Sequence, residues 1–193
     1  MIKAIIFDCF GVLTTEGFKV FRDKYILDAD KREAANKVMD ELNAGKYPYD
    51  DFVKILSELA SVPEKTTKSY LDENKPNEPL FDFIRNDLKP KYKIGMLSNA
   101  GDDWIEELFE PQDIKLFDDI VLSYKFGMIK PDSAIYDLAA KRLGVTKEEV
   151  VFIDDTTDHC RGAENCGMKA VIYKDFPQMK RRLTEILAAG ANH

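Results

Sequence analysis

Short runs of apolar residues recur along the chain, and each run is followed by polar or turn-forming residues. Each run is too short for a helix, and an unbroken apolar run is typical of a strand that is buried on both faces. Strands of that kind occur in parallel sheets that are covered by helices on both sides. The pattern therefore predicts parallel strands at Ala4–Phe10, Ile94–Leu97, Ile120–Leu122, Val150–Ile153 and Ala170–Tyr173.

Between these runs, apolar residues recur three and four positions apart, which is the spacing along one face of a helix. The spacing predicts helices over Leu80–Leu88, Trp104–Phe109, Ile135–Leu143 and Met179–Leu187. Asp132 precedes the third of these, and aspartate is a favoured residue at the start of a helix. The alternation of strands and helices indicates an α/β fold with a doubly wound parallel sheet.

A long insertion separates the first two predicted strands. It contains helical patterns at Lys31–Leu42 and Tyr49–Ala60, and it is too long to be a simple connection. We expect residues 15–79 to form a small α-helical cap over the carboxyl end of the sheet, and residues 1–14 and 80–193 to form the core domain. The aromatic residues of the insertion fit either the core of the cap or a substrate pocket: Phe18, Phe21, Tyr25, Tyr47 and Tyr49.

The composition narrows the class of protein. Of the 193 residues, 45% are hydrophobic and 33% are charged, which is typical of a globular protein. The net charge of −7 argues against a surface that binds nucleic acid or an anionic membrane. No apolar run approaches the roughly 20 residues of a membrane-spanning helix, and the first residues do not resemble a signal peptide. We therefore expect a cytoplasmic protein, a monomer or a homodimer, with no nucleic-acid or membrane partner.

Cysteine and histidine are scarce in this sequence. The three cysteines, Cys9, Cys160 and Cys166, show no paired pattern and indicate reduced thiols. We interpret Cys9 as a small buried apolar side chain. The only histidines are His159 and His193, which are too few to complete a structural zinc site and which argue against a Ser-His-Asp hydrolase.

Polar side chains follow three of the predicted strands, at the end of a parallel sheet where ligands bind. A carboxylate there, such as Asp8, can attack phosphorus and form an aspartyl-phosphate. Two adjacent carboxylates are electrostatically costly unless they share a cation, and Mg²⁺ prefers oxygen ligands. Taken singly, these positions also fit a turn or the start of a helix. The residues are Asp8 after the first strand, Ser98 and Asn99 after the second, and Asp154 and Asp155 after the fourth.

Three further positions complete the candidate site. Lys130, held in a loop before a proline, is well placed to neutralise charge between a nucleophile and a phosphate. If the first and fourth strands are neighbours, the backbone carbonyl of Phe10 can join the carboxylates around one Mg²⁺ ion. A hydroxyl and a backbone N–H at the end of a strand fit a phosphoryl oxygen. We expect phosphate binding by Gly11, Ser98, Asn99 and Lys130.

Four segments, taken in order, resemble the motifs of the haloacid dehalogenase-like hydrolase superfamily. The segments are Ile5–Leu13, Leu97–Asn99, Lys130–Pro131 and Phe152–Asp155. The resemblance implies a Rossmann-like sheet in which the first strand is central and the fourth lies beside it. It also implies that the small helical cap is inserted between the first and second strands.

The same resemblance implies a role for each residue. Asp8 is expected to be the nucleophile, and Ser98 and Lys130 are expected to hold the phosphoryl group. Asp8, Asp154 and Asp155 are expected to bind Mg²⁺. The expected substrate is a small phosphorylated metabolite.

Phe10 departs from the pattern of that family's phosphatases, in which an aspartate at this position acts as general acid and base. Phenylalanine cannot transfer protons, and general acid–base help is worth roughly 10²–10⁴-fold in rate. Three functions remain open. They are an Mg²⁺-dependent phosphatase that is slow or restricted to good leaving groups, a dehalogenase-like hydrolase, and a binding protein without activity. The acidic pair Asp154 and Asp155 favours the phosphatase, because the resemblance implies that dehalogenases of this family have a motif without a metal site.

Overall fold

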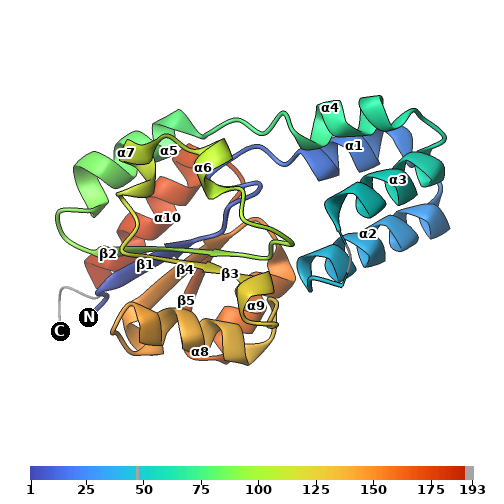
Figure 1. The fold of residues 1–193 in the computed structure, drawn as a ribbon. Helices are drawn as coiled ribbons and strands as arrows, with labels where there is room; N and C mark the ends of the chain where they lie inside the picture. Colours follow the sequence, from blue (N-terminus) through green and yellow to red (C-terminus); the bar gives the residue numbers. More distant parts are fainter. Residues whose placement is uncertain (47, 190–193) are drawn as a thin grey trace.

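The computed structural model describes residues 1–46 and 48–189, so Tyr47 and His193 lie outside the described residues. Its centre is a five-stranded sheet in which all neighbouring strands are parallel, as the apolar runs predict. The strand order across the sheet is β3-β2-β1-β4-β5 (Figure 1). The bounds are Ala4–Phe7 for β1, Lys93–Ser98 for β2, Asp119–Leu122 for β3, Val150–Asp154 for β4 and Lys169–Ile172 for β5.

β1 is the central strand, and its side chains alternate between the two faces of the sheet. Ile5 and Phe7 belong to the hydrophobic cluster on one face, whereas Ala4 and Ile6 belong to the cluster on the other. Both faces bury apolar side chains, which explains the unbroken apolar run. β1 pairs with β2 on one side and with β4 on the other. The expected neighbourhood of the first and fourth strands is confirmed, so the residues that follow these strands meet at one edge of the sheet.

Helices cover both faces of the sheet, which confirms the doubly wound fold (Figure 1). The face that contains Ile6 is covered by α8 (Ser133–Arg142) and α9 (Thr157–Asn165). The face that contains Phe7 is covered by α5 (Glu78–Phe83), the π-helical turn η1 (Ile84–Leu88), α6 (Ile105–Leu108), α7 (Pro111–Ile114) and α10 (Phe176–Ala189). Two 3-10 turns, η2 (Ser123–Lys125) and η3 (Lys147–Glu149), follow β3 and precede β4.

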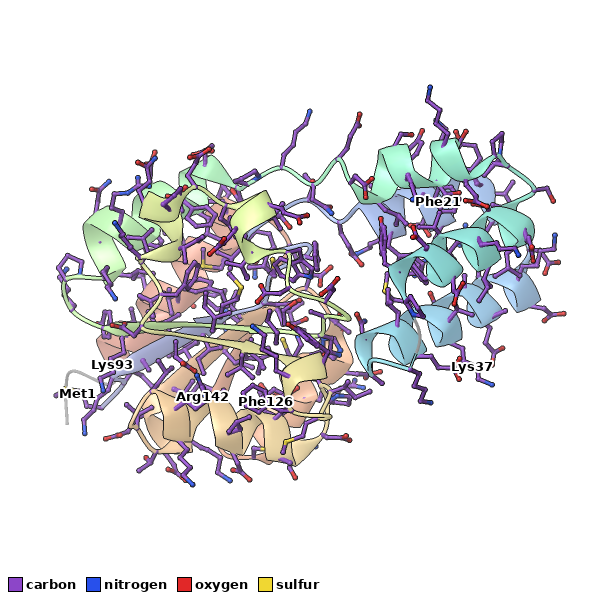
Figure 2. The ribbon with its side chains drawn as sticks, viewed as in Figure 1. Met1, Phe21, Lys37, Lys93, Phe126 and Arg142 are labelled. Atoms are coloured by element: carbon purple, nitrogen blue, oxygen red, sulfur yellow. The ribbon has the colours of Figure 1, made fainter. Side chains whose placement is uncertain are left out.

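Four helices between β1 and α5 form a separate bundle, which we call the helical unit (Figure 1). They are α1 (Gly17–Tyr25), α2 (Ala29–Asn43), α3 (Tyr49–Ala60) and α4 (Glu64–Leu71). The unit has a hydrophobic cluster of its own, in which Phe18 and Phe21 are buried and Tyr25 and Tyr49 pack at the edge. Figure 2 shows Phe21 among these helices. The described aromatic residues of the insertion therefore contribute to its own core.

The helical unit is joined to the sheet by two chain segments that run side by side, one after β1 and one before α5. The backbone N–H of Thr15 donates to the carbonyl of Lys75 at 3.0 Å, and the N–H of Lys75 donates to the hydroxyl of Thr15 at 2.9 Å. A second contact lies at the end of α2, where the hydroxyl of Ser123 donates to the carbonyl of Asn43 at 2.8 Å. The two connecting segments are thus bonded to each other, and the end of α2 contacts the residue that follows β3.

Several local expectations need correction. The helix expected over Trp104–Phe109 is reduced to the short α6, since Pro111 disfavours helical backbone in the preceding residue and Phe109 is already extended. Asp132 occupies the position before α8, but the described residues include no capping bond from its side chain. Neither α1 nor α4 was expected. Among the described residues, no helix is long and apolar enough to cross a membrane.

Candidate active site

Three buried charged groups meet where β1 and β4 end. Asp8 follows β1, Asp154 ends β4, and Lys130 lies in the loop before α8. The Nζ atom of Lys130 is 2.7 Å from Asp8 Oδ1 and 2.6 Å from Asp154 Oδ2. The exposed fractions are 7% for Asp8, 2% for Lys130 and 0% for Asp154. Because buried charges are costly unless they are paired, these ion pairs are what allow the cluster to exist inside the fold.

The two carboxylates respond differently to burial. Burial raises the pKa of Asp8 well above its ordinary value, the charge of Asp154 adds to the increase, and Lys130 opposes it. Burial also acts to raise the pKa of Asp154, but Lys130 and His159 outweigh that effect and hold this pKa below its ordinary value. Burial acts to lower the pKa of Lys130, yet Asp154 and Asp8 together raise it, so the lysine stays charged. Two buried carboxylates share one buried ammonium group, and the cluster can accept further positive charge.

Asn99 fixes the loop that carries Lys130. The side-chain amide of Asn99 donates to the carbonyl of Lys130 at 3.1 Å, and its Oδ1 accepts from the backbone N–H of Lys130 at 2.8 Å. The bond between Lys130 and Pro131 is a cis peptide. Ser98, the last residue of β2, is buried, with its hydroxyl 3.4 Å from the carbonyl of Asn99. The fold therefore brings the second and third predicted segments together, and the side chain of Asn99 positions Lys130.

Asp155 is only partly buried and faces the helical unit. Its Oδ2 is 3.1 Å from the Nζ of Lys19 in α1. Gly11 lies against the same carboxylate, since a Cβ at this position would be 2.7 Å from Asp155 Oδ2. The φ angle of Gly11 is +84°, a conformation that strongly favours glycine, and a larger residue here would displace the carboxylate of Asp155. Gly11 and Asp155 thus lie together, and Lys19 is a neighbour that the sequence pattern did not indicate.

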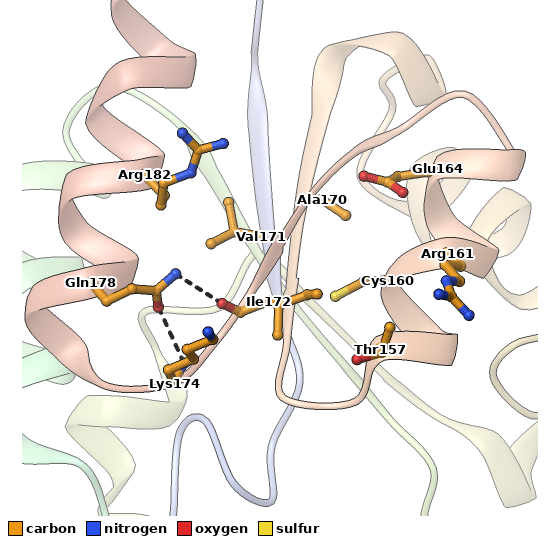
Figure 3. A pocket seen from close by; sticks show the side chains of 10 residues that line it. All are labelled: Thr157, Cys160, Arg161, Glu164, Ala170, Val171, Ile172, Lys174, Gln178 and Arg182. Carbon is orange, nitrogen blue, oxygen red and sulfur yellow. Dashed lines mark hydrogen bonds between the residues drawn. The ribbon is translucent and has the colours of Figure 1, made fainter.

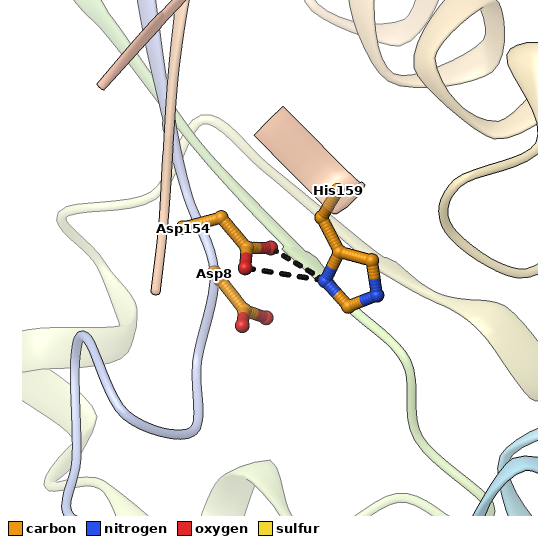
Figure 4. Close-up of side chains that lie close together, drawn as sticks. All are labelled: Asp8, Asp154 and His159. Atoms are coloured by element: carbon orange, nitrogen blue, oxygen red, sulfur yellow. Dashed lines mark hydrogen bonds and ion pairs between the residues drawn. The ribbon is translucent and has the colours of Figure 1, made fainter. Parts of the chain in front are cut away.

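His159 in α9 is a residue of the site that the motifs did not indicate. Its Nδ1 lies 3.0 Å from Oδ2 and 3.1 Å from Oδ1 of Asp154 (Figure 4). One possible ligand atom from each of Asp8, Asp154 and His159 lies within 4.8 Å of the others. The position of His159 in the sequence is the feature that could have indicated it. A helix that begins directly after the acidic pair can place its first residues over the end of the strand.

The side chain of Phe10 packs in the sheet domain. Its ring lies edge-to-face against Trp104, with the ring centroids 4.7 Å apart and the planes at 60°. The residue is partly buried against the hydrophobic cluster that contains Phe7. Position 10 therefore contributes packing through its side chain, and the predicted metal ligand at this position is its backbone carbonyl.

A pocket of about 740 Å³ adjoins the candidate site at the junction between the sheet and the helical unit. Its walls include Gly11, Glu16, Lys19 and Asp155. Another pocket, of about 420 Å³, lies over β5 between α9 and α10 (Figure 3). Within the described part of the chain, the walls of this second pocket include none of the predicted site residues. The walls of the first pocket include two of the predicted site residues, Gly11 and Asp155.

Comparison with known proteins finds relatives that match this chain over different lengths. D-ribitol-5-phosphate phosphatase from Bacteroides thetaiotaomicron is 27% identical over 205 residues, which cover 97% of this chain and 99% of that protein. Drimenol cyclase drtB from Aspergillus calidoustus is 33% identical over 108 residues, which cover 56% of this chain but only 18% of that protein. The chain therefore spans a small part of one relative and nearly all of the other.

Solved structures show the same fold. A HAD family enzyme from Bacteroides thetaiotaomicron, solved in complex with magnesium and inorganic phosphate, has a TM-score of 0.69 at 21% identity, with 90% of this chain and 95% of that chain covered. The family of haloacid dehalogenase-like hydrolases matches residues 2–167, which include β1, the buried charged cluster and His159. This protein belongs to the haloacid dehalogenase-like hydrolase family.

Proposed function

We propose that this hydrolase removes phosphate from a small phosphorylated metabolite, with Asp8 as the nucleophile and a divalent metal ion as cofactor. The observation that carries the proposal is the buried cluster in which Lys130 bridges Asp8 and Asp154 at the ends of two adjacent strands. The full-length match to a D-ribitol-5-phosphate phosphatase supports phosphatase chemistry. The magnesium and inorganic phosphate bound to the HAD family enzyme of the same fold support the cofactor and the type of ligand.

The donor set fits a divalent cation such as Mg²⁺. Asp8 and Asp154 offer buried carboxylate oxygens, and we propose that the carbonyl of Phe10 and the carboxylate of Asp155 complete the set. Carboxylates and carbonyls are the ligands that Mg²⁺ prefers. Burial and the charge of Asp154 raise the pKa of Asp8 despite Lys130, so further positive charge at the site would favour the ionised carboxylate. When bound, the ion supplies that charge and polarises a phosphoryl oxygen.

The reaction proceeds in two displacements at phosphorus. An ionised oxygen of Asp8 attacks phosphorus while the bond to the leaving oxygen breaks, which gives an aspartyl-phosphate. The leaving oxygen takes a proton from water. Lys130 stabilises the negative charge between Asp8 and the phosphoryl group, and we propose that Ser98, Asn99 and Gly11 hold the phosphoryl oxygens. A second water then attacks phosphorus and the bond to Asp8 breaks. The hydroxide left by the first water takes up the proton that the second releases, and inorganic phosphate leaves.

Phe10 makes the second displacement the slower one. No group on its side chain can take a proton from the attacking water or give one to the leaving oxygen. Substrates with good leaving groups need no such protonation in the first displacement. We therefore propose acyl phosphates or sugar 1-phosphates in preference to ordinary alkyl phosphates.

We propose that the helical unit, within residues 15–79, acts as a cap on a core domain formed by residues 1–14 and 80–193. Its separate hydrophobic cluster supports a distinct unit. The pocket of about 740 Å³ at the junction supports a role in substrate selection. Lys19 extends from this unit to Asp155, so a substrate that reaches the site meets residues from both parts.

A screen of phosphorylated metabolites tests the proposal. The wild-type protein should release inorganic phosphate from at least one compound in the presence of Mg²⁺ or Mn²⁺, and chelation should stop the release. Asp8→Asn keeps the shape of the side chain but removes the nucleophile, so activity should fall by at least a thousandfold while the circular dichroism spectrum is unchanged. A verified Asp8→Asn protein with near wild-type activity would contradict the proposal.

A further inference from the structure

The ring of His159 extends the charged cluster beyond Asp154, whose Oδ2 is in contact with both Lys130 and His159. Lys130 binds one oxygen of Asp8 and one of Asp154. His159 Nδ1 lies at nearly equal distances from both Asp154 oxygens, 3.0 and 3.1 Å (Figure 4). Potential ligand atoms of Asp8, Asp154 and His159 all lie within 4.8 Å of one another, which leaves them close enough to surround one ion.

The nitrogen donor changes the chemistry of the site. Mg²⁺ selects oxygen ligands, whereas imidazole nitrogen binds first-row transition metals much better. A site that adds one imidazole to its oxygen donors therefore favours ions such as Mn²⁺ and Co²⁺ more than an all-oxygen site does. The carboxylates are buried, so the imidazole also lies where a bound ion is shielded from bulk water.

We propose that His159 is a direct ligand of the metal ion in this protein, together with Asp8 and Asp154, and that it shifts the metal preference from Mg²⁺ toward Mn²⁺ or Co²⁺. The inference rests on the proposed metal-dependent function and deepens it by naming a ligand and a class of ion.

The helical unit supports this role of His159. When Nδ1 binds the ion, the ring proton is on Nε2, which is then free to donate to a carboxylate or to water. Burial raises the pKa of Asp40 in α2, and the charge of His159 opposes the increase, so the helical unit contributes a carboxylate to the electrostatic surroundings of His159.

Pulsed electron paramagnetic resonance of the Mn²⁺-loaded protein tests the proposal directly. A coordinated imidazole gives nitrogen modulation of the Mn²⁺ signal, and the chain contains only two histidines, His159 and His193. The modulation should be present in the wild type and in the control His193→Asn, and it should be lost in His159→Asn. In parallel, calorimetry should show that His159→Asn lowers the preference for Co²⁺ over Mg²⁺ by about ten- to a hundredfold, the range typical for loss of a group that supports a metal site.

Metal binding by Asp8→Asn distinguishes a failure of this inference from a failure of the proposed function. If Mn²⁺ binds in an Asp8-dependent manner but the wild type shows no nitrogen modulation, His159 is not a ligand, and the proposed function survives without this inference. If neither Mn²⁺, Co²⁺ nor Mg²⁺ binds, both proposals are overturned. The measurement on the wild type needs no substitution, so a poorly folded His159→Asn protein does not prevent a decision.

Discussion

Lys130 controls the balance of charge at the site. Its ammonium group is buried and lies within 2.7 Å of Asp8 and 2.6 Å of Asp154. A buried ion pair adds little net stability when intact, but removal of one partner leaves an uncompensated buried charge. The lysine therefore contributes to stability as well as to the proposed chemistry.

Lys130→Met should lower the free energy of unfolding by about 3–5 kcal/mol, because it leaves two buried carboxylates without a partner. Denaturant titration in the presence of a chelator measures this loss. The control is Lys125→Met, which removes an exposed lysine paired with Asp103 at 2.6 Å; it should cost less than about 1 kcal/mol. Equal losses in the two variants would mean that the buried cluster does not depend on its lysine.

Phe10→Asp should increase steady-state turnover of acetyl phosphate by at least tenfold, since general acid–base help is worth roughly 10²–10⁴-fold. Phe10 is partly buried, so a carboxylate at this position retains some access to water. The same change removes the ring contact with Trp104 and should reduce stability. Phe10→Leu is the control, because it loses the aromatic contact without gaining a proton donor. If the two variants turn over at the same rate, proton transfer does not limit the reaction.

At the scale of secondary structure, α1 is the element that connects the helical unit to the site. It begins after Glu16, and its Lys19 pairs with Asp155 after β4. Burial raises the pKa of Glu16 from 4.5 to about 7, and Asp155 adds to the increase while Lys19 opposes it. The start of this helix is therefore less stable when Glu16 is ionised.

The pH dependence of stability follows from that pKa. The folded protein binds the proton of Glu16 more tightly than the unfolded chain does, so protonation of Glu16 stabilises the folded state. This stabilisation is complete below pH 4.5 and is lost as the pH rises through about 7. Glu16→Gln should remove the contribution of Glu16 to the slope of unfolding free energy against pH. It should also raise the free energy of unfolding at pH 8 by about 1 kcal/mol, a value that is reduced because Glu16 is partly exposed. Denaturant titrations between pH 5 and 8 check it. The control Glu33→Gln, at an exposed position of α2, should leave the slope unchanged; a Glu16→Gln curve that follows the wild type would contradict the assignment.

At the scale of the whole molecule, the sequence predicts the elements whose position depends on a local pattern of apolar residues. The five strands lie where the apolar runs indicate, and α3 has the predicted bounds Tyr49–Ala60. The family resemblance correctly implied the central position of β1 and the adjacent β4. Asp8 and Asp154 come together because strand ends in a parallel sheet share one edge, and Lys130 reaches both carboxylates from the loop before α8.

Other features depend on tertiary contacts that no local pattern contains. Lys19 and Asp155 are far apart in the sequence, and their pairing requires the helical unit to lie against the sheet. His159 carries no motif signal of its own, and only its distance of 3.0 Å from Asp154 Oδ2 places it at the site. The side chain of Asn99 binds the backbone of Lys130, a function that a strand-ending asparagine does not indicate by itself.

In the proposed mechanism, Asp8 forms a covalent phosphoryl intermediate. The most direct measurement is rapid quenching of the protein with acetyl phosphate and saturating Mg²⁺ or Mn²⁺, followed by mass spectrometry of the peptide that contains Asp8. We predict that one phosphoryl group appears on Asp8 and accumulates before the steady state, because Phe10 cannot activate water for the second displacement. The adduct should be absent from Asp8→Asn and from chelated protein. No phosphoryl group at any time, or one on a residue other than Asp8, would contradict the account.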